Sequence, residues 1–168
     1  MLGHSRIGTA KHTKYGDFIV FKGDNILGQS EATDYFYNFW KSLDHPSRKD
    51  IKPAEIKKYL EHIVMMDVQQ SHGELALHVR LIGTFVASFY GELSGQDVRA
   101  MSNKGAADRI YRASEQTINH KAPVLTVTPA LSKDKQHLEA LALYMPLLDA
   151  AGEIEKIMVC VDVISKHA

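Results

Sequence analysis

Apolar side chains recur at three- and four-residue steps after residue 30, which is the spacing of one face of an α-helix. The first such stripe consists of Tyr35, Phe36, Phe39, Trp40 and Leu43. Ser30 and Thr33 are candidate N-caps for this helix, because a side-chain oxygen there can accept a bond from an unpaired backbone amide. Pro53 favours the start of a second helix, whose apolar face would include Ile56 and Tyr59. The sequence therefore predicts two helices before residue 63.

Beyond residue 63 the apolar runs are short and bounded by turn residues, as in β-strands. The predicted strands span residues 63–68, 75–82, 124–131, 138–147 and 154–164. A short helix containing Phe85 and Phe89 and a longer helix over 105–120 separate the second strand from the third. The turn between the third and fourth strands is expected at 133–135. This order predicts an α+β fold, with a five-stranded antiparallel sheet, helices on one face and an N-terminal helical extension.

The first thirty residues differ from the rest in being rich in glycine, lysine and small polar residues, with one apolar cluster at 18–21. They are interpreted as an N-terminal arm, either a short hairpin or a flexible segment. Residues 31–168 then form one domain, which suits a chain of 168 residues with a single hydrophobic core.

Six short sequence motifs follow one another along the chain, at residues 39–43, 50–56, 60–67, 79–84, 90–95 and 143–152. They read FWKSL, DIKPAEI, LEHIVMMD, VRLIGT, YGELSG and LYMPLLDAAG. The series resembles a bacterial PAS-like family of short single-domain proteins, over roughly residues 35–164. The resemblance implies a PAS fold and a role in sensing or signalling, and it supplies no ligand, because a fold alone does not fix a function.

A ligand cavity, if one exists, is expected between the sheet and the helices that cover it. Strand alternation and the helical stripes give the candidate pocket residues Val79, Leu81, Phe85, Phe89, Tyr111, Ser114, Ile118, Leu143 and Val161. The alternative is that these side chains fill the space themselves, as close packing of protein interiors favours.

The opposite sheet face is predicted to be too apolar to remain in water, so something should cover it. The candidate partner face consists of Tyr35, Phe36, Phe39, Trp40, Tyr144 and Met158. One interpretation is a homodimer in which the aromatic helix covers the sheet of a second copy. The other is coverage by the helix of the same chain. Arg80 and Asp162 are expected to pair across this face, and the alternative is that Arg80 binds an anionic ligand.

Composition excludes several classes of protein. Lysine and arginine number 20, as do aspartate and glutamate, so the excess positive charge of a nucleic-acid-binding protein is missing. No apolar run approaches the ~20 residues that span a bilayer. The single cysteine, Cys160, cannot form an intramolecular disulfide. These features predict a cytoplasmic protein that acts away from membranes and nucleic acids.

Cofactor chemistry finds little support in the sequence. The histidines lack the close spacing of zinc ligands, and no metal site is predicted. His120 stands at the end of the long helix, where a haem ligand occurs in some PAS proteins, but a lone histidine there is better explained by the helix dipole. Cys160 has no flavin-reactive motif around it and is interpreted as a packing residue. The ligand is therefore left unidentified.

The function predicted from these observations is a non-catalytic sensory or regulatory module that binds a small molecule or a signalling protein. No nucleophile elbow, phosphate loop or dinucleotide motif is present in the sequence. The alternative is a small isomerase or hydrolase that uses an inward carboxylate or imidazole as a general base in a cone-shaped cavity. His78 and Asp162 are the candidates for that role, and a one-residue error in strand register would turn them inward.

Overall fold

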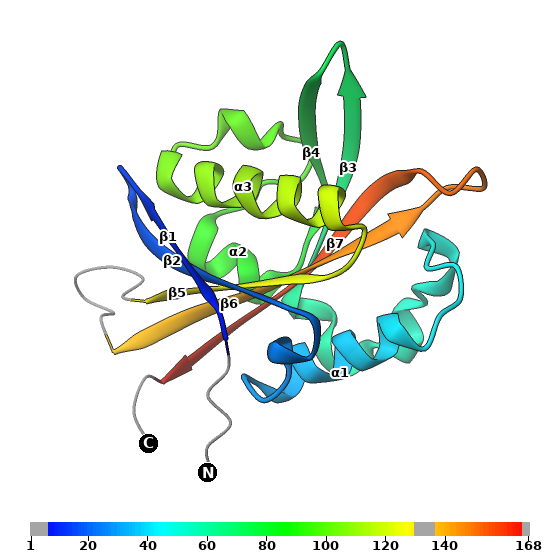
Figure 1. Cartoon of the computed structure of the whole chain (residues 1–168), viewed down its shortest axis with the longest axis horizontal. Helices are drawn as coiled ribbons and strands as arrows, with labels where there is room; N and C mark the ends of the chain where they lie inside the picture. Colours follow the sequence, from blue (N-terminus) through cyan, green and yellow to red (C-terminus); the bar gives the residue numbers. More distant parts are fainter. Residues whose placement is uncertain (1–6, 130–136, 166–168) are drawn as a thin grey trace.

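The computed structural model describes residues 7–129 and 137–165, which form a seven-stranded antiparallel sheet with helices on both faces (Figure 1). The strands are β1 (Thr9–Thr13), β2 (Gly16–Lys22), β3 (Ile63–Ser71), β4 (Glu74–Ile82), β5 (Val124–Pro129), β6 (Leu138–Leu148) and β7 (Ile154–Ser165). The α-helices are α1 (Glu31–Lys41), α2 (Thr84–Tyr90) and α3 (Lys104–His120). Short 3-10 turns are η1 (Gly23–Ile26), η2 (Arg48–Asp50), η3 (Pro53–Glu55), η4 (Lys57–His62) and η5 (Val98–Ala100). The α+β class is confirmed, with strand order β1-β2-β5-β6-β7-β3-β4.

Two strands were missing from the predicted sheet. The hairpin β1–β2 lies within the first thirty residues, and β2 pairs with β5 from Ile19 opposite Val127 to Lys22 opposite Val124. The predicted count of five strands was therefore too low, because this hairpin extends the sheet beyond β5. Residues 130 and 131 of the expected third strand, and the turn expected at 133–135, lie outside the described residues.

Helices cover both faces of the sheet and not one, as Figure 1 shows with α1 on one side and α2 and α3 on the other. The reason lies in the central strand β6, whose successive side chains are apolar on both sides. Leu141, Leu143 and Met145 pack toward α1, whereas Ala142 and Tyr144 face α2 and α3. A sheet that is apolar on both faces needs a cover on each.

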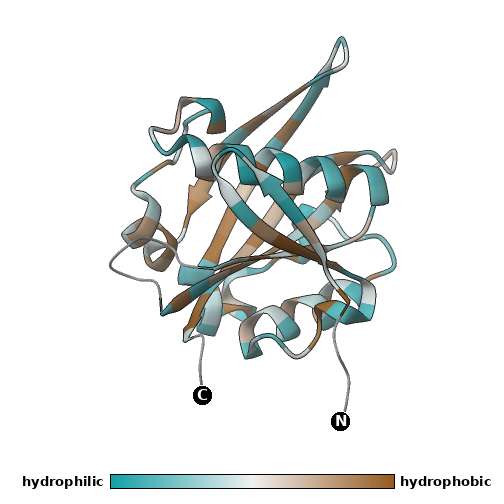
Figure 2. Cartoon of the chain, turned by 60° about the vertical axis from the view of Figure 1, so that its left-hand side comes forward, coloured by the Kyte–Doolittle hydropathy of each residue, from teal (hydrophilic) through white to brown (hydrophobic). Residues whose placement is uncertain are grey.

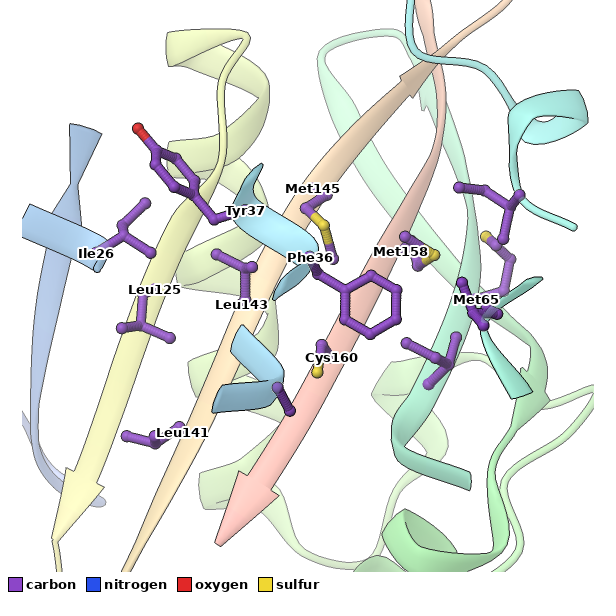
Figure 3. Packing of buried hydrophobic residues seen from close by; sticks show 14 of the residues in the cluster. Ile26, Phe36, Tyr37, Met65, Leu125, Leu141, Leu143, Met145, Met158 and Cys160 are labelled. Carbon is purple, nitrogen blue, oxygen red and sulfur yellow. The ribbon is translucent and has the colours of Figure 1, made fainter. Parts of the chain in front are cut away.

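Helix α1 begins where the sequence predicts, because the Ser30 hydroxyl accepts a hydrogen bond of 3.1 Å from the Thr33 amide. Its apolar face lies on β6 and β7, where Phe36 is fully buried (Figure 3). At the other end, the Trp40 indole nitrogen donates a bond of 2.8 Å to the carbonyl oxygen of Pro146 on β6. The helix is thus fixed to the sheet of its own chain by packing along its length and by a polar contact near its end.

The second predicted helix is replaced by the two 3-10 turns η3 and η4. Pro53 does stand at the first position, as expected, but the turn ends after Glu55. A 3-10 turn advances about 2.0 Å per residue against 1.5 Å for an α-helix, so the same residues cover a longer path to β3. Ile56 remains buried in the cluster beneath α1.

A β-bulge interrupts the pairing of β3 with β4. Met65 lies opposite Leu81 and Met66 lies opposite Val79, which leaves Arg80 as an extra residue on β4. Because the bulge reverses the alternation of faces, Val79 points toward α2 and α3, and Leu81, beyond it, lies opposite a residue of the α1 face. This shift decides which β4 residues can reach a site beneath α2 and α3.

Candidate functional site

A cavity lies between the sheet and the helices α2 and α3. Every central strand contributes to its wall, together with both helices and the loop between them. The lining residues are Val64, Met66, Val79, Ile82, Val86, Tyr90, Leu93, Met101, Ala106, Arg109, Ile110, Thr126, Thr128, Ala140, Ala142, Tyr144, Val159 and Val161. The space open to the centre of a water-sized molecule is about 70 Å³. That is about five times the 10–15 Å³ that one water needs, so the cavity holds more than a single solvent molecule.

The cavity wall is mainly aliphatic. Figure 2 shows the strands brown, that is hydrophobic, where they run beneath a largely hydrophilic α3. The space arises because small side chains face it, among them Ala106 on α3 and Ala140 and Ala142 on β6. Where alanine stands opposite alanine or valine, the helix and sheet cannot fill the gap between them.

Polar groups in this wall are few, and they come from four different elements: Tyr90, Arg109, Thr126, Thr128 and Tyr144. Within the described wall there is no carboxylate, imidazole or thiol. An apolar cavity with a small number of polar groups is the usual form of a small-molecule site.

Tyr144 is the most deeply buried of these polar groups, with 4% of the residue exposed. Burial raises the pKa of its phenol well above the ordinary value, and the Arg109 charge opposes that rise, while Tyr90 adds to it. No described residue forms a hydrogen bond with the Tyr144 hydroxyl. A neutral hydroxyl therefore stands in the cavity wall with its bonding capacity unused by the described chain.

Helix α3 brings two further predicted residues to the sheet, and both lie outside the cavity wall. The Tyr111 hydroxyl accepts a bond of 3.2 Å from the Leu77 amide, and the Arg99 guanidinium lies 4.7 Å from the centre of the Tyr111 ring. Ser114 is fully buried, and its hydroxyl has no hydrogen-bond partner among the described residues.

Of the nine predicted pocket residues, Val79 and Val161 line the cavity. Phe85 and Ile118 pack against the buried residues beneath α2 and α3 but do not line the cavity. The Phe89 ring contacts the Phe85 ring, with ring centres 5.2 Å apart. Tyr111 and Ser114 have the positions given above.

Leu81 and Leu143 were placed on the wrong face. Leu81 follows the bulge and is 37% exposed, while Leu143 is buried beneath α1. The residues that replace them are Ile82 on β4 and Ala142 and Tyr144 on β6. The alternation of side chains along a strand does not identify these residues unless one already knows that β4 has a bulge at Arg80 and which β6 residues face α2 and α3.

The predicted partner face is mostly covered within the chain. Phe36 and Met158 are buried beneath α1, Phe39 and Trp40 are half-buried there, and Tyr144 faces the cavity. Tyr35, 40% exposed, is the member of the set that stays outside. The second interpretation, coverage of this face by the same chain, is what the structure shows.

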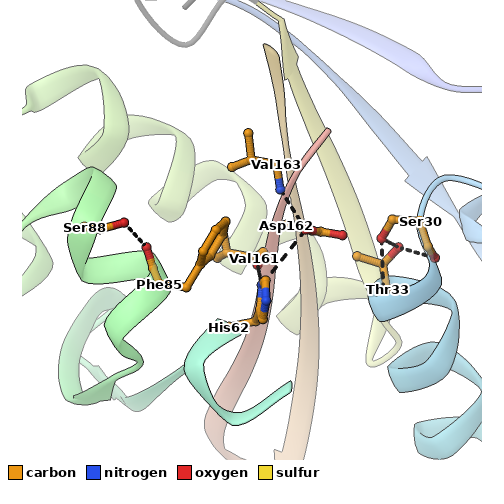
Figure 4. Close-up of polar contacts among 8 residues, drawn as sticks. All are labelled: Ser30, Thr33, His62, Phe85, Ser88, Val161, Asp162 and Val163. Atoms are coloured by element: carbon orange, nitrogen blue, oxygen red, sulfur yellow. Dashed lines mark hydrogen bonds and ion pairs between the residues drawn. The ribbon is translucent and has the colours of Figure 1, made fainter. Parts of the chain in front are cut away.

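The residues suggested for catalysis or ion pairing lie outside the cavity wall. Asp162 Oδ1 lies 4.0 Å from Nδ1 of His62, which donates to the Val161 carbonyl oxygen at 2.8 Å (Figure 4). His78 Nε2 lies 3.9 Å from a carboxylate oxygen of Asp97. Arg80 pairs with Asp67 at 3.0 Å and not with Asp162, because β3 lies between β4 and the strand β7 that carries Asp162.

The candidate cofactor positions are also apart from the cavity. His120 is exposed at the end of α3, beside the Lys22 ammonium group. Cys160 is buried beneath α1, and burial raises the pKa of its thiol. The described residues contain no group of three or more side chains able to hold a metal ion. No helix within residues 7–129 and 137–165 is both long and apolar enough to cross a membrane.

Comparison with known proteins gives one family. The profile of the PAS domain family matches residues 28–161 of the chain. No curated protein matches the chain. A solved structure similar to this one is that of a sensory box sensor histidine kinase from Vibrio cholerae. The similarity covers 68% of this chain and 90% of that one, at 13% identity and a TM-score of 0.46.

Proposed function

The chain belongs to the PAS domain family, and from that premise we propose that it is a non-catalytic sensory or regulatory module. In this proposal a small molecule occupies the cavity beneath α2 and α3, and its presence is passed to a signalling protein. The observation that carries the proposal is the cavity itself, which combines an aliphatic wall with a few inward polar groups.

Binding is favoured over catalysis by the chemistry of the wall. The described lining offers hydroxyl groups and one guanidinium, and it lacks a carboxylate or imidazole that could accept a proton at neutral pH. His62 and Asp162 do approach each other, but they lie outside the lining. The isomerase or hydrolase alternative therefore lacks a general base at the cavity.

A path from the cavity to the surface is available through aromatic rings. Helix α2 contributes Val86 to the wall, and the ring of Phe85 beside it contacts the tilted His62 ring with ring centres 4.3 Å apart. The His62 ring in turn lies 6.5 Å from that of Tyr59, which contacts the exposed Tyr35 on α1 at 5.2 Å. A shift of α2 on ligand binding would therefore move the rings in this series and change the position of Tyr35 on the outer surface of α1.

Homodimerisation is part of the proposal and would use the same outer surface of α1, because the inner surface is occupied. Light scattering over a range of concentrations tests this part separately. A mass of twice 18.8 kDa that falls to the single-chain value in Tyr35→Asp supports it, and a monomer at high concentration contradicts it.

The test of the proposed function is ligand retention by wild type and by a variant with the cavity filled. Ala142→Leu adds apolar volume in the middle of the wall, and Ala54→Leu adds the same group at an exposed position. Native mass spectrometry and thermal shifts with a library of small metabolites are measured on all three proteins.

We expect wild type and Ala54→Leu to bind the same compound, and Ala142→Leu to fold but lose it. Two results would overturn the proposed function. One is the lack of any bound compound in wild type across the library. The other is equal binding by Ala142→Leu, which would place the ligand elsewhere.

A further inference from the structure

Arg109 is the cationic side chain in the described cavity wall, and it has no carboxylate partner among the described residues. The acid next to it in the sequence, Asp108, is engaged by Arg112 at 2.8 Å on the outer side of α3. Arg109 is half-buried, beside Ile110 and Ala106, which also line the cavity. A guanidinium that borders apolar space without a counter-charge is a binding position for an anion.

Two phenol groups act at the same place. Tyr144 and Tyr90 line the cavity with Arg109, and the pKa of Tyr144 is lowered by Arg109 and raised by Tyr90. A phenol is protonated at neutral pH, and burial raises the pKa of Tyr144 further, so its hydroxyl is a hydrogen-bond donor there. A fixed positive charge and a neutral donor thus both belong to the wall of this cavity.

We propose that the cavity takes a small organic carboxylate, with its two oxygens on Arg109 and the Tyr144 hydroxyl and its apolar body against the aliphatic wall. This inference rests on the proposed function, since it names the ligand class of the same cavity. The planar guanidinium can hold both oxygens of a carboxylate in a fork of parallel hydrogen bonds, and one of these oxygens can accept a further bond from the Tyr144 hydroxyl.

The composition of the wall favours a carboxylate over a phosphate. A phosphate carries up to two negative charges, and the described lining offers one cation with a majority of aliphatic groups. A space of about 70 Å³ is less than half of the roughly 150 Å³ cavity that holds benzene, so it restricts the ligand to a short aliphatic chain. The carboxylate would therefore have a compact apolar body.

The experiment compares acids with uncharged molecules of the same shape. Butyrate and isobutyrate are titrated against butyramide and isobutyramide, with binding followed by ligand-observed NMR. The proteins are wild type, Arg109→Gln, Tyr144→Phe and the control Arg112→Gln, which removes a positive charge from the exposed side of the same helix. Thermal unfolding of each variant shows that it is folded.

We expect at least one acid to bind wild type about tenfold or more tightly than its amide, since a hydrogen-bonded charge pair is worth about a factor of ten or more. Arg109→Gln should remove that preference, Arg112→Gln should keep it, and Tyr144→Phe should weaken the acid several-fold without affecting the amide.

The outcomes separate this inference from the proposed function. Equal binding of acids and amides, or an unchanged preference in Arg109→Gln and Tyr144→Phe, overturns the carboxylate assignment while the cavity remains a ligand site. If no acid and no amide binds wild type, while another class of compound in the metabolite library does, the carboxylate assignment alone falls. If the library also yields nothing, both proposals fall.

Discussion

The two faces of the central sheet are packed in different ways. Beneath α1, large side chains such as Phe36, Leu143 and Met158 are fully buried and in contact with one another (Figure 3). Beneath α2 and α3, the corresponding β6 positions are Tyr144 and the small residues Ala140 and Ala142, and all three line a cavity. The same strand therefore supplies bulk to one side and space to the other.

This difference separates stability from function within one domain. A filled apolar layer stabilises the fold by burying surface and by close contact. A cavity gives up such contacts, and it is retained in a folded protein at a cost in stability. The α1 face is thus where the fold is secured, and the α2–α3 face is where a ligand would be bound.

The largest effect should come from removing bulk on the filled face. Phe36→Ala deletes a fully buried ring between α1 and the strands, and we expect a loss of about 3–5 kcal/mol in the free energy of unfolding. Urea denaturation followed by circular dichroism measures it. Tyr35→Ala is the control, because that neighbouring ring is 40% exposed and should cost much less. Equal losses would mean that α1 does not depend on its buried face.

Adding bulk should sharpen the contrast. Ala32 lies in the filled layer with 4% of its surface exposed, whereas Ala142 faces the cavity. We expect Ala32→Leu to destabilise the protein by about 1–3 kcal/mol, because a full layer has no room for three more carbons. Ala142→Leu should change the stability by less than about 1 kcal/mol. The same denaturation experiment applies, and similar losses in both variants would mean that the cavity is closed in solution.

Much of the fold can be predicted from the sequence, because its causes are local. The polar start of α1 at Ser30, the long helix before β5 and all the strands from β3 to β7 follow from spacing and turn residues. The hairpin β1–β2 was harder to assign, since Phe18 to Phe21 form a single short apolar run that suits a strand or a loose segment equally.

The cavity wall was much less predictable, for two physical reasons. Strand alternation gives two sets of residues without saying which faces which helix, and on β6 both sets are apolar. The bulge at Arg80 then exchanges the faces of β4 between Val79 and Leu81.

Arg109 was missed because it reads as a solvent-exposed charge between Asp108 and Ile110. The sequence did contain one sign that α3 packs closely on the sheet, namely its three small buried residues Ala106, Ala107 and Ala113.

Removing a single hydroxyl should change the stability less than changing the size of a side chain. The effect should again differ between the α1 face and the α2–α3 face. The Tyr37 hydroxyl at the edge of the α1 face donates to Asp24 at 3.1 Å, so Tyr37→Phe should lower the urea midpoint slightly. The Tyr144 hydroxyl has no described partner, so Tyr144→Phe should leave the midpoint unchanged or raise it. A clear loss in Tyr144→Phe would indicate that its hydroxyl is bonded inside the free protein, against the ligand role given to it.

The smallest expected effect is a loss of wild-type stability that is absent at neutral pH and develops only in alkaline solution. Burial, with the Asp24 carboxylate adding to it, raises the pKa of Tyr37 to about 12, against an ordinary value of 10.0. Between those two pH values the unfolded chain has lost the phenol proton and the folded chain has kept it. The stability that depends on the neutral phenol is therefore complete below pH 10 and falls as the pH rises toward 12. In Tyr37→Phe this fall is missing, so the difference in unfolding free energy between wild type and variant should shrink from pH 9 to pH 12 in urea titrations. Two parallel curves would show that the Tyr37 phenol titrates as it does in the unfolded chain, and that this edge of the α1 face is open to water.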